Sequence, residues 1–432
     1  MNEEQKINKK ITYGIVAVLL IVLITIGATY AYFSAQAETD VQTVTTGTLT
    51  MGFETGDTLN LTGLIPIKDS EIKSKAAEIP FSVTNTGSEH MNITIKLKDI
   101  TIADDLKDVD FRWGLYNPDK EDAKGTEMGV SFGIFKYAET GGEEIILQDV
   151  ILDSGSATKN YILRIWMHDD GAEQNYMQGE TFSAKIDVTG TAIEYTDESC
   201  FTFDESTGTI TGYDADTCGT DVVIPKEIDD VTVTKIGDDT FSAGEHDFYL
   251  THVIIPDSVT EIGDGAFEDS LVEQLTIPES VTKIDNYAFR GRNLAQVTIP
   301  ESVTEISGMA FDGNPLSKVI LPGSVTTVGY NAFEGSPLSE LILMEGITSI
   351  EDGAFLGCDF TTIELPSSVM VIKVMDSGDR SSPFESCDNL QEIILRGKTS
   401  KPAGFEYGWN CAGEWDYSTE SYSKCANVVF RP

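Results

Sequence analysis

A 22-residue repeat constrains this chain more than any other feature of its sequence. Proline recurs at this step in one column, and phenylalanine recurs at the same step in another. The columns are Pro256, Pro278, Pro300, Pro322 and, two steps on, Pro366, and Phe267, Phe289, Phe311, Phe333 and Phe355. Met344 takes the missing place in the proline column. Self-similarity at such a period is typical of solenoids, whose units contact only their neighbours.

The unit from Leu294 to Phe311 reads L-x-x-V-x-I-P-x-S-V-T-x-I-x-x-x-A-F. One unit cannot bury so many apolar side chains, whereas stacked units share a continuous core. The V-x-I pair predicts a strand that joins a parallel sheet, and the proline ends that strand because it has no N–H to donate. The V-T-x-I segment predicts a second short strand, and the Ala-Phe pair a short helical turn.

These columns resemble the BspA-like class of leucine-rich repeats, whose signature is I-P-x-S-V-T-x-I-x-x-x-A-F. The resemblance implies a leucine-rich-repeat solenoid over residues 222–396. We expect a cap at each end, because terminal repeats otherwise expose their cores: residues 196–221 before the solenoid and 397–432 after it. The caps contain two cysteine pairs, Cys200 with Cys218 and Cys411 with Cys425, which we predict to be disulfides. Cys358 and Cys387 share one repeat column and are either a bridge or two free thiols.

Residues 35–195 contain about eight strand-like runs separated by turn signals such as Asn117-Pro118-Asp119 and Gly141-Gly142. Such spacing predicts a β-sandwich or jelly roll. The fold class expected for the whole chain is therefore mainly β, with an N-terminal sandwich followed by a solenoid with short parallel strands.

The N-terminus predicts export. Lys6, Lys9 and Lys10 precede Ile11–Phe33, a run without charge, so residues 1–31 are a signal peptide or a membrane anchor. The stretch Gly27–Ser34 resembles the export signal of camelysin/TasA-like matrix proteins, and Thr46–Thr50 resembles the start of their mature domain. The resemblance implies cleavage after Ala31. With either outcome the rest of the chain lies outside the cytoplasm.

Charge and composition exclude several functions. The formal net charge is −42, from 29 Lys+Arg against 71 Asp+Glu, which argues against nucleic acid and against an anionic membrane surface. Camelysin-like proteins have been classed as metallopeptidases, but the chain has four histidines and no H-E-x-x-H run. His90 and His168 are isolated, and we expect them to face solvent. We predict no catalysis, no cofactor and no metal site.

Two hypotheses of function remain. The first is a binding module or adhesin at the cell surface, whose partner is a protein or a glycan on a host or neighbouring cell. The second is a fibre subunit of a biofilm matrix that polymerises through the sandwich, with Tyr32–Thr50 pairing to a neighbouring subunit or forming the first strand of its own sandwich. Contact with the membrane is expected only through the N-terminal segment.

Four aromatic side chains near the C-terminus are expected to fill the open end of the solenoid core rather than to stack on sugar rings. They are Phe405, Tyr407, Trp409 and Trp415.

The outward positions of the first strand of each turn are the candidate binding face. They form two ladders: Ile254, Thr276, Thr298, Ile320, Ile342 and Glu364, and beside it His252, Gln274, Gln296, Lys318, Glu340 and Thr362. Ile320 and Ile342 are expected to form an exposed apolar strip, a typical contact feature, although β-branched residues also simply suit exposed strands. The insertions around Gly244–Phe248 and Lys373–Ser382 are the other candidate contact sites.

Overall fold

The computed structural model describes residues 51–54, 59–62, 65–108, 110–121, 127–155, 157–169, 177, 179–243, 249–374, 382–406, 408–411, 415–416, 421–422 and 425–431. The export segment, cleavage after Ala31, the segment Tyr32–Thr50 and most of the two insertions lie outside these residues. Among the described residues, no helix combines the length and the apolar character needed to cross a membrane.

The N-terminal domain is a sandwich of two sheets, as predicted. The first sheet has the order β1-β4-β9-β6-β7, with β3 beside β9; the second has the order β2-β10-β5-β8. In the first sheet the bounds are β1 Met51–Glu54, β3 Pro66–Ile67, β4 Ala77–Asn85, β6 Phe111–Glu121, β7 Glu127–Ile134 and β9 Ala157–His168. In the second they are β2 Leu59–Thr62, β5 His90–Ile102, β8 Glu144–Leu152 and β10 Thr181–Ile193.

Alternation of side chains builds the sandwich core. In β5, Ile93, Ile95 and Leu97 point inward and are fully buried, while the residues between them are half-exposed. They pack against Phe111, Leu163 and other apolar side chains of the first sheet. Three short helices complete the domain: η1 Asp69–Glu71, α2 Ile72–Lys75 and η2 Asp104–Leu106.

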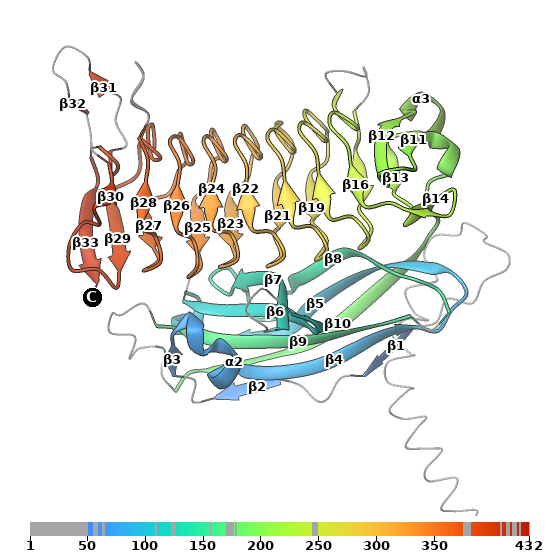
Figure 1. Ribbon diagram of the computed structural model, residues 1–432. Helices are drawn as coiled ribbons and strands as arrows, with labels where there is room; N and C mark the ends of the chain where they lie inside the picture. Colours follow the sequence, from blue (N-terminus) through green and yellow to red (C-terminus); the bar gives the residue numbers. More distant parts are fainter. Residues whose placement is uncertain are drawn as a thin grey trace, which may run out of the picture.

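The C-terminal part is a solenoid whose turns each contribute two short strands (Figure 1). The first strands lie on the side of the sandwich and are β17 His252–Ile254, β19 Gln274–Thr276, β21 Gln296–Thr298, β23 Lys318–Leu321, β25 Glu340–Leu343, β27 Thr362–Leu365 and β29 Glu392–Arg396. We call their outward side the first-strand face. β13 Asp221–Val223 and β33 Asn427–Arg431 pair with its two ends in parallel register.

The second strands form one continuous sheet, which we call the second-strand sheet. It has ten strands in the order β11-β12-β16-β18-β20-β22-β24-β26-β28-β30. The repeat strands are β16 Lys235–Ile236, β18 Glu261–Ile262, β20 Lys283–Ile284, β22 Glu305–Ile306, β24 Thr327–Val328, β26 Ser349–Ile350, β28 Val371–Ile372 and β30 Gly404–Phe405. Their pairing is parallel, as the repeat predicts.

A column of stacked phenylalanines forms the centre of the solenoid. Neighbouring rings have centroids 5.2–6.1 Å apart and lie within 7–14° of parallel. The column consists of Phe241, Phe267, Phe289, Phe311, Phe333, Phe355 and Phe384. Because every ring is covered by the turns on both sides, the core is continuous from one cap to the other.

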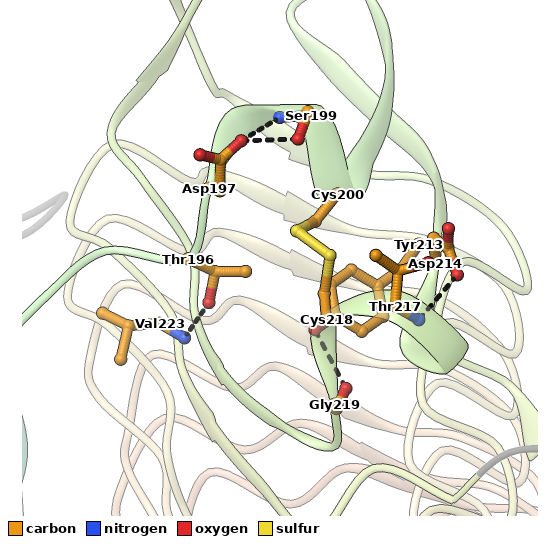
Figure 2. Close-up of a disulfide and its surroundings, with 10 residues drawn as sticks. All are labelled: Thr196, Asp197, Ser199, Cys200, Tyr213, Asp214, Thr217, Cys218, Gly219 and Val223. Carbon is orange, nitrogen blue, oxygen red and sulfur yellow. Dashed lines mark hydrogen bonds between the residues drawn. A yellow bond between two sulfur atoms is a disulfide. The ribbon is translucent and has the colours of Figure 1, made fainter.

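A disulfide-stapled hairpin closes the first end of the solenoid (Figure 2). β11 Phe201–Asp204 and β12 Thr209–Tyr213 form the hairpin, and Cys200 is bonded to Cys218 of the short helix α3 Ala215–Cys218. The Asp214 carboxylate caps α3 by accepting from the Thr217 amide, and the Tyr213 hydroxyl donates to the Gly219 carbonyl. Cys411 and Cys425 are bonded at the other end, so both predicted cap disulfides are present.

The other end is closed by aromatic side chains. Phe405 and Trp409 are buried in the solenoid core with ring centroids 4.8 Å apart. This position fits the plug that we expected rather than a sugar-stacking surface.

Cys358 and Cys387 are both free and buried. The thiol of Cys358 donates to the Phe333 carbonyl, and that of Cys387 donates to the Phe355 carbonyl at 3.0 Å. Asn314 occupies the same repeat column two turns earlier than Cys358, and its amide donates to the Phe289 carbonyl at 2.7 Å. At Asn314, Cys358 and Cys387 the column therefore supplies a donor to the preceding turn, which a disulfide between the two cysteines would remove. Burial raises the pKa of the Cys358 thiol, so it keeps this proton at neutral pH.

Replacing one ring of the phenylalanine column tests how far the turns depend on each other. We expect Phe311→Ala to destabilise the solenoid by about 3–5 kcal/mol, because it leaves a cavity between two stacked rings. Phe430→Ala is the matched control, since that ring is 38% exposed. Denaturant unfolding followed by circular dichroism measures both. A loss below about 1 kcal/mol for Phe311→Ala would contradict a shared core.

Candidate binding surfaces

The sandwich covers the first-strand face (Figure 1), so the prediction that this face is exposed is wrong. Ile254, Thr276, Glu340 and Ile342 are buried, with 1–9% of their surface exposed. Gln274, Gln296 and Thr362 remain exposed, and the other ladder residues are half-buried: His252, Thr298, Lys318, Ile320 and Glu364. The side chains point outward from the solenoid, as the strand pattern requires, but most of them meet a second domain there instead of solvent.

An apolar cluster holds the centre of this contact. Met344 of the solenoid is buried against Tyr116 and Trp166 of the sandwich, and Ile320 packs against the same cluster. Ile320 therefore contacts the sandwich instead of forming part of an exposed strip. Met344 occupies a place where the proline column is broken, and its amide donates to the Leu321 carbonyl at 3.0 Å. The break in the column is the sequence signal for this contact.

A row of acidic side chains forms one border of the contact. Each member directly follows a proline of the repeat: Asp257, Glu279 and Glu301. Asp257 binds the ammonium groups of Lys159 and Lys226, at 3.0 Å and 2.8 Å. Because Lys226 also binds Asp153 of the sandwich at 2.6 Å, these charges link the two domains twice. Burial raises the pKa of Asp257, but the two lysines outweigh it and lower the pKa to about 2.

The next two acids of the row bind the edge of the first sandwich sheet. Glu279 accepts from the Asn117 amide at 2.8 Å and from Lys120 at 3.1 Å. Glu301 accepts from the backbone N–H of Gly129 at 2.8 Å, and its own N–H donates to the Gly129 carbonyl at 2.8 Å. A Cβ atom at position 129 would overlap the Phe132 ring and lie 2.8 Å from the Glu301 carboxyl carbon, so any larger residue there would have to displace these side chains.

A buried chain of charged groups closes the contact at the C-terminal end. His168 is only 3% exposed, so the expectation that it faces solvent is wrong. Its Nδ1 lies 2.7 Å from the Asp69 carboxylate, and the Arg396 guanidinium of β29 contacts its Nε2. Arg396 also binds Glu364 at 2.5 Å and the Asp169 carbonyl at 3.2 Å. Since arginine only donates, Nε2 accepts, and the ring proton is on Nδ1, where it donates to Asp69.

This arrangement keeps His168 neutral. Burial lowers its pKa, and the Arg112 charge lowers it further, against the opposing effect of Asp69. Burial acts to raise the pKa of Asp69, but its interaction with His168, including the hydrogen bond that it accepts, and the charges of Arg112 and Arg396 lower it to about 2. A proton added to His168 would place a second cation against Arg396.

At the other end of the contact, the pKa of His252 is raised, whereas that of His168 is lowered. Its ring lies between Asp149 of the sandwich, at 3.8 Å, and Asp221 of the cap, at 2.7 Å. The Asp149 carboxylate contributes most to raising the pKa of His252 to about 9, and the hydrogen bond that the ring donates to Asp221 adds to it. His252 therefore carries its charge at neutral pH and joins the domains as a cation.

The cavities between the domains include the following two. One of about 420 Å³ lies between β8 and the strands β19–β23, and its lining includes Glu144 and Lys318. The other, of about 380 Å³, is lined by the groups around His168 and Arg396. Within the described ranges, no group of three or more His, Cys, Asp or Glu side chains is placed to hold a metal ion.

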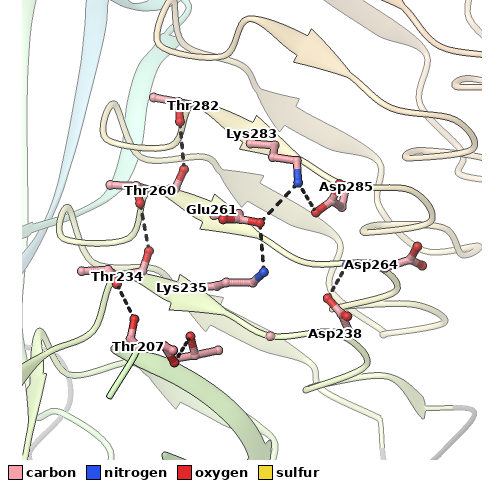
Figure 3. Close-up of polar contacts among 12 residues, drawn as sticks. Thr207, Thr234, Lys235, Asp238, Thr260, Glu261, Asp264, Thr282, Lys283 and Asp285 are labelled. Carbon is pink, nitrogen blue, oxygen red and sulfur yellow. Dashed lines mark hydrogen bonds and ion pairs between the residues drawn. The ribbon is translucent and has the colours of Figure 1, made fainter. Parts of the chain in front are cut away.

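The second-strand sheet is the long sheet surface that the sandwich leaves open. A threonine ladder runs along it, in which each hydroxyl donates to the carbonyl of the threonine one turn earlier (Figure 3). Near the N-terminal cap the neighbouring column carries charge, with Glu261 between Lys235 at 2.9 Å and Lys283 at 3.3 Å. Further along, the same column is neutral and holds Thr327, Ser349 and Val371.

Six copies of the family described as "BspA type Leucine rich repeat region" match the chain, within residues 220–339, 260–377 and 309–404. The solenoid is a BspA-type leucine-rich repeat region. The family "Camelysin metallo-endopeptidase" matches residues 6–113. This second match includes the N-terminal part of the sandwich and does not by itself show an enzyme.

Solved structures similar to the chain include leucine-rich proteins of three bacteria. A leucine rich cell surface protein from Faecalibacterium prausnitzii is 26% identical with a TM-score of 0.36; the match covers 49% of this chain and 57% of that one. The Leucine Rich Repeat protein of T. pallidum is 21% identical with a TM-score of 0.31, covering 47% and 87%. A leucine-rich repeat protein from Bacteroides ovatus is 19% identical with a TM-score of 0.30, covering 56% and 76%. No curated protein matches the chain.

Acid should open the contact between the sandwich and the BspA-type solenoid. The pKa of His168 is below its usual 6.5 when the domains are closed, so its contribution to closure is complete above pH 6.5 and is lost as the pH falls. We expect the closed-to-open ratio to fall by up to about ten-fold per pH unit below that point. The radius of gyration from small-angle X-ray scattering, measured from pH 8 to pH 5, reports the opening.

The variant His168→Asn should remove this acid-dependent step, and His90→Asn should leave it unchanged. Because Asp69 and Asp257 have pKa values of about 2, they stay ionised over this range and add no step of their own. An unchanged radius for the wild-type chain at pH 5, with native circular dichroism, would contradict the prediction.

Proposed function

We propose that the chain is an exported, non-catalytic adhesin that binds a protein or glycan on another cell through the second-strand sheet of its BspA-type solenoid. The observation that carries this proposal is the division of the solenoid surface between two sheets. The first-strand face is largely occupied by the chain's own sandwich, whereas the second-strand sheet runs the length of the solenoid and no domain covers it among the described residues. The uncharged export segment Ile11–Phe33 supports a location outside the cytoplasm.

The C-terminal half of the second-strand sheet has the composition of a contact surface. The exposed column Thr304, Thr326 and Thr348 continues into Met370, which is 52% exposed. Beside it, Thr327, Ser349 and Val371 are half-buried and uncharged. In a chain of net charge −42, a surface of hydroxyl and methyl groups, beside which Glu351 is paired with Lys373 at 2.7 Å, limits repulsion of acidic cell surfaces.

The ladder also makes this surface rigid. The Thr326 hydroxyl donates to the Thr304 carbonyl at 3.2 Å, and that of Thr348 donates to the Thr326 carbonyl at 3.0 Å. The hydroxyl oxygens keep their acceptor sites toward solvent, so hydrogen bonds to a partner require little further ordering of side chains.

Two charged substitutions in the ladder test the proposal. We expect Thr326→Lys with Thr348→Lys to weaken binding to cells by about ten-fold or more, because two ammonium groups would have to be desolvated. Thr260→Lys with Thr282→Lys is the matched control, since it makes the same change in the same column nearer the N-terminal cap. Binding of fluorescent protein to cells is measured by flow cytometry. Equal binding by both double variants and the wild type would contradict the assigned surface.

A fibre subunit is the second candidate, and the free sheet edges of the sandwich favour it. At one edge of the first sheet, Gly129 of β7 binds Glu301 of the solenoid, and the edge strand β8 of the second sheet contacts β17 and β19. β1 and β2, at the opposite edges, have no strand beyond them among the described residues. An open edge is the place where a strand from another subunit adds by backbone pairing.

Deletion of Tyr32–Thr43 tests this second candidate. If these residues pair with a neighbouring subunit, the deletion should abolish filaments and leave a folded monomer, as judged by electron microscopy and circular dichroism. Filaments that persist after the deletion, or a wild-type mature chain that never polymerises, would contradict it.

A further inference from the structure

The cavity of about 420 Å³ lies between the two domains and is lined by both of them. β8 and the aromatic residues Trp113 and Phe132 line it from the sandwich, and the strands β19, β21 and β23 line it from the solenoid. Sites of this size between domains commonly bind small molecules.

Lys318 extends into this cavity without a partner. Its ammonium group makes no hydrogen bond or ion pair among the residues that the structure describes. Its strand neighbour Glu340 is paired with Lys136 of the sandwich at 2.5 Å. Burial lowers the pKa of the Lys318 amine, and the charges of Glu144 and Glu340 offset only part of this effect. A mostly buried ammonium group without a partner is costly, so its presence calls for an explanation.

Glu144 faces the same cavity from β8. Burial raises its pKa, more than the Lys318 charge and the Trp113 indole lower it. Glu144 and Lys318 do not form an ion pair with each other, although both line the cavity. The cavity lining therefore includes one cation, Lys318, and two carboxylates, of which Glu143 is paired with Lys96 at 2.8 Å and Glu144 has no ion pair among the described residues.

The remaining wall of the cavity is mixed. Leu275, Ile299 and Ile320 provide apolar surface, and the amides of Gln148 and Gln296 provide polar groups. A simple anion would meet Glu144, and a simple cation would meet Lys318. A molecule that carries both charges and an apolar part matches all three features.

We propose that this cavity binds a small zwitterion, an α-amino acid with an apolar side chain. Its carboxylate binds the Lys318 ammonium, its ammonium binds the Glu144 carboxylate, and its side chain packs on Leu275 and Ile320. Because residues from both domains make the site, the bound ligand also stabilises the closed arrangement. This site goes beyond the proposed adhesin function and does not depend on it.

Isothermal titration calorimetry on the full chain tests the proposal, with L-leucine and L-phenylalanine as probes. N-acetyl-L-leucine lacks the ammonium group and L-leucinamide lacks the carboxylate. We expect at least one of the free amino acids to bind, and both blocked forms of leucine to bind about ten-fold more weakly or not at all, because each loses one charged hydrogen bond. No heat from either free amino acid at about 10 mM would overturn the proposal, since affinity weaker than this is not specific recognition. So would equal binding of the blocked forms.

Two variants locate the site. Lys318→Met and Glu144→Gln should each weaken binding by about ten-fold or more, while Lys283→Met, on the second-strand sheet, should leave it unchanged. Lys318→Met should not lower the unfolding temperature of the ligand-free chain, because the lysine has no partner to lose. This measurement separates loss of the site from loss of the fold.

Unchanged binding by both variants would place the ligand elsewhere and overturn the proposal. The cell-binding assay gives its result independently of this one.

Discussion

Contact between successive 22-residue turns is the interaction on which the rest of the molecule depends. Each turn both stacks its phenylalanine and donates its backbone N–H to the next turn, as Phe311 does to Ala332 and Phe333 to Ala354, each at 2.9 Å. The longest irregular step in the column shows how strict this requirement is. Between Phe355 and Phe384 the chain contains seven extra residues, yet the rings stay stacked at 6.1 Å and Phe355 still donates, to Pro383. Insertions are therefore tolerated only where they leave the stack intact.

The features that repeat were the ones that the sequence predicted well. The apolar columns occur in several turns, so a single substitution such as Met344 does not hide them, and alternation in β5 was sufficient to predict a strand with one buried side. The two cap disulfides followed from the position of their cysteines outside the repeat. The orientation of the first-strand side chains was also right, because it depends only on the period of a strand.

The docking of the sandwich onto those side chains could not be predicted in the same way. Docking of the sandwich depends on groups that have no local pattern: a glycine at position 129, lysines at 120, 136 and 159, and acids that follow the prolines. In the sequence, each of these residues looks like an ordinary surface residue, because its contact in the other domain is not visible there. The burial of His168 has no local sequence signal either, since its ring contacts Asp69 and also Arg396, which is 228 residues further along the chain. Met344 broke the proline column and so marked the contact, as did Arg396, which follows Leu395 where Pro366 follows the paired Leu365.

Docking also determines which surfaces are left for function. The chain has only 29 lysines and arginines, and it places several of them against acids of the other domain, so the contact is electrostatically specific as well as apolar at its centre. It uses the first-strand face and the strands β7 and β8, and it leaves the second-strand sheet and the opposite edges of the sandwich, β1 and β2, without a neighbour among the described residues. Because these free regions belong to different domains, binding at one does not block the other. A subunit that added to a fibre through β1 would still present its second-strand sheet to a partner, so adhesion and assembly are compatible in one closed molecule.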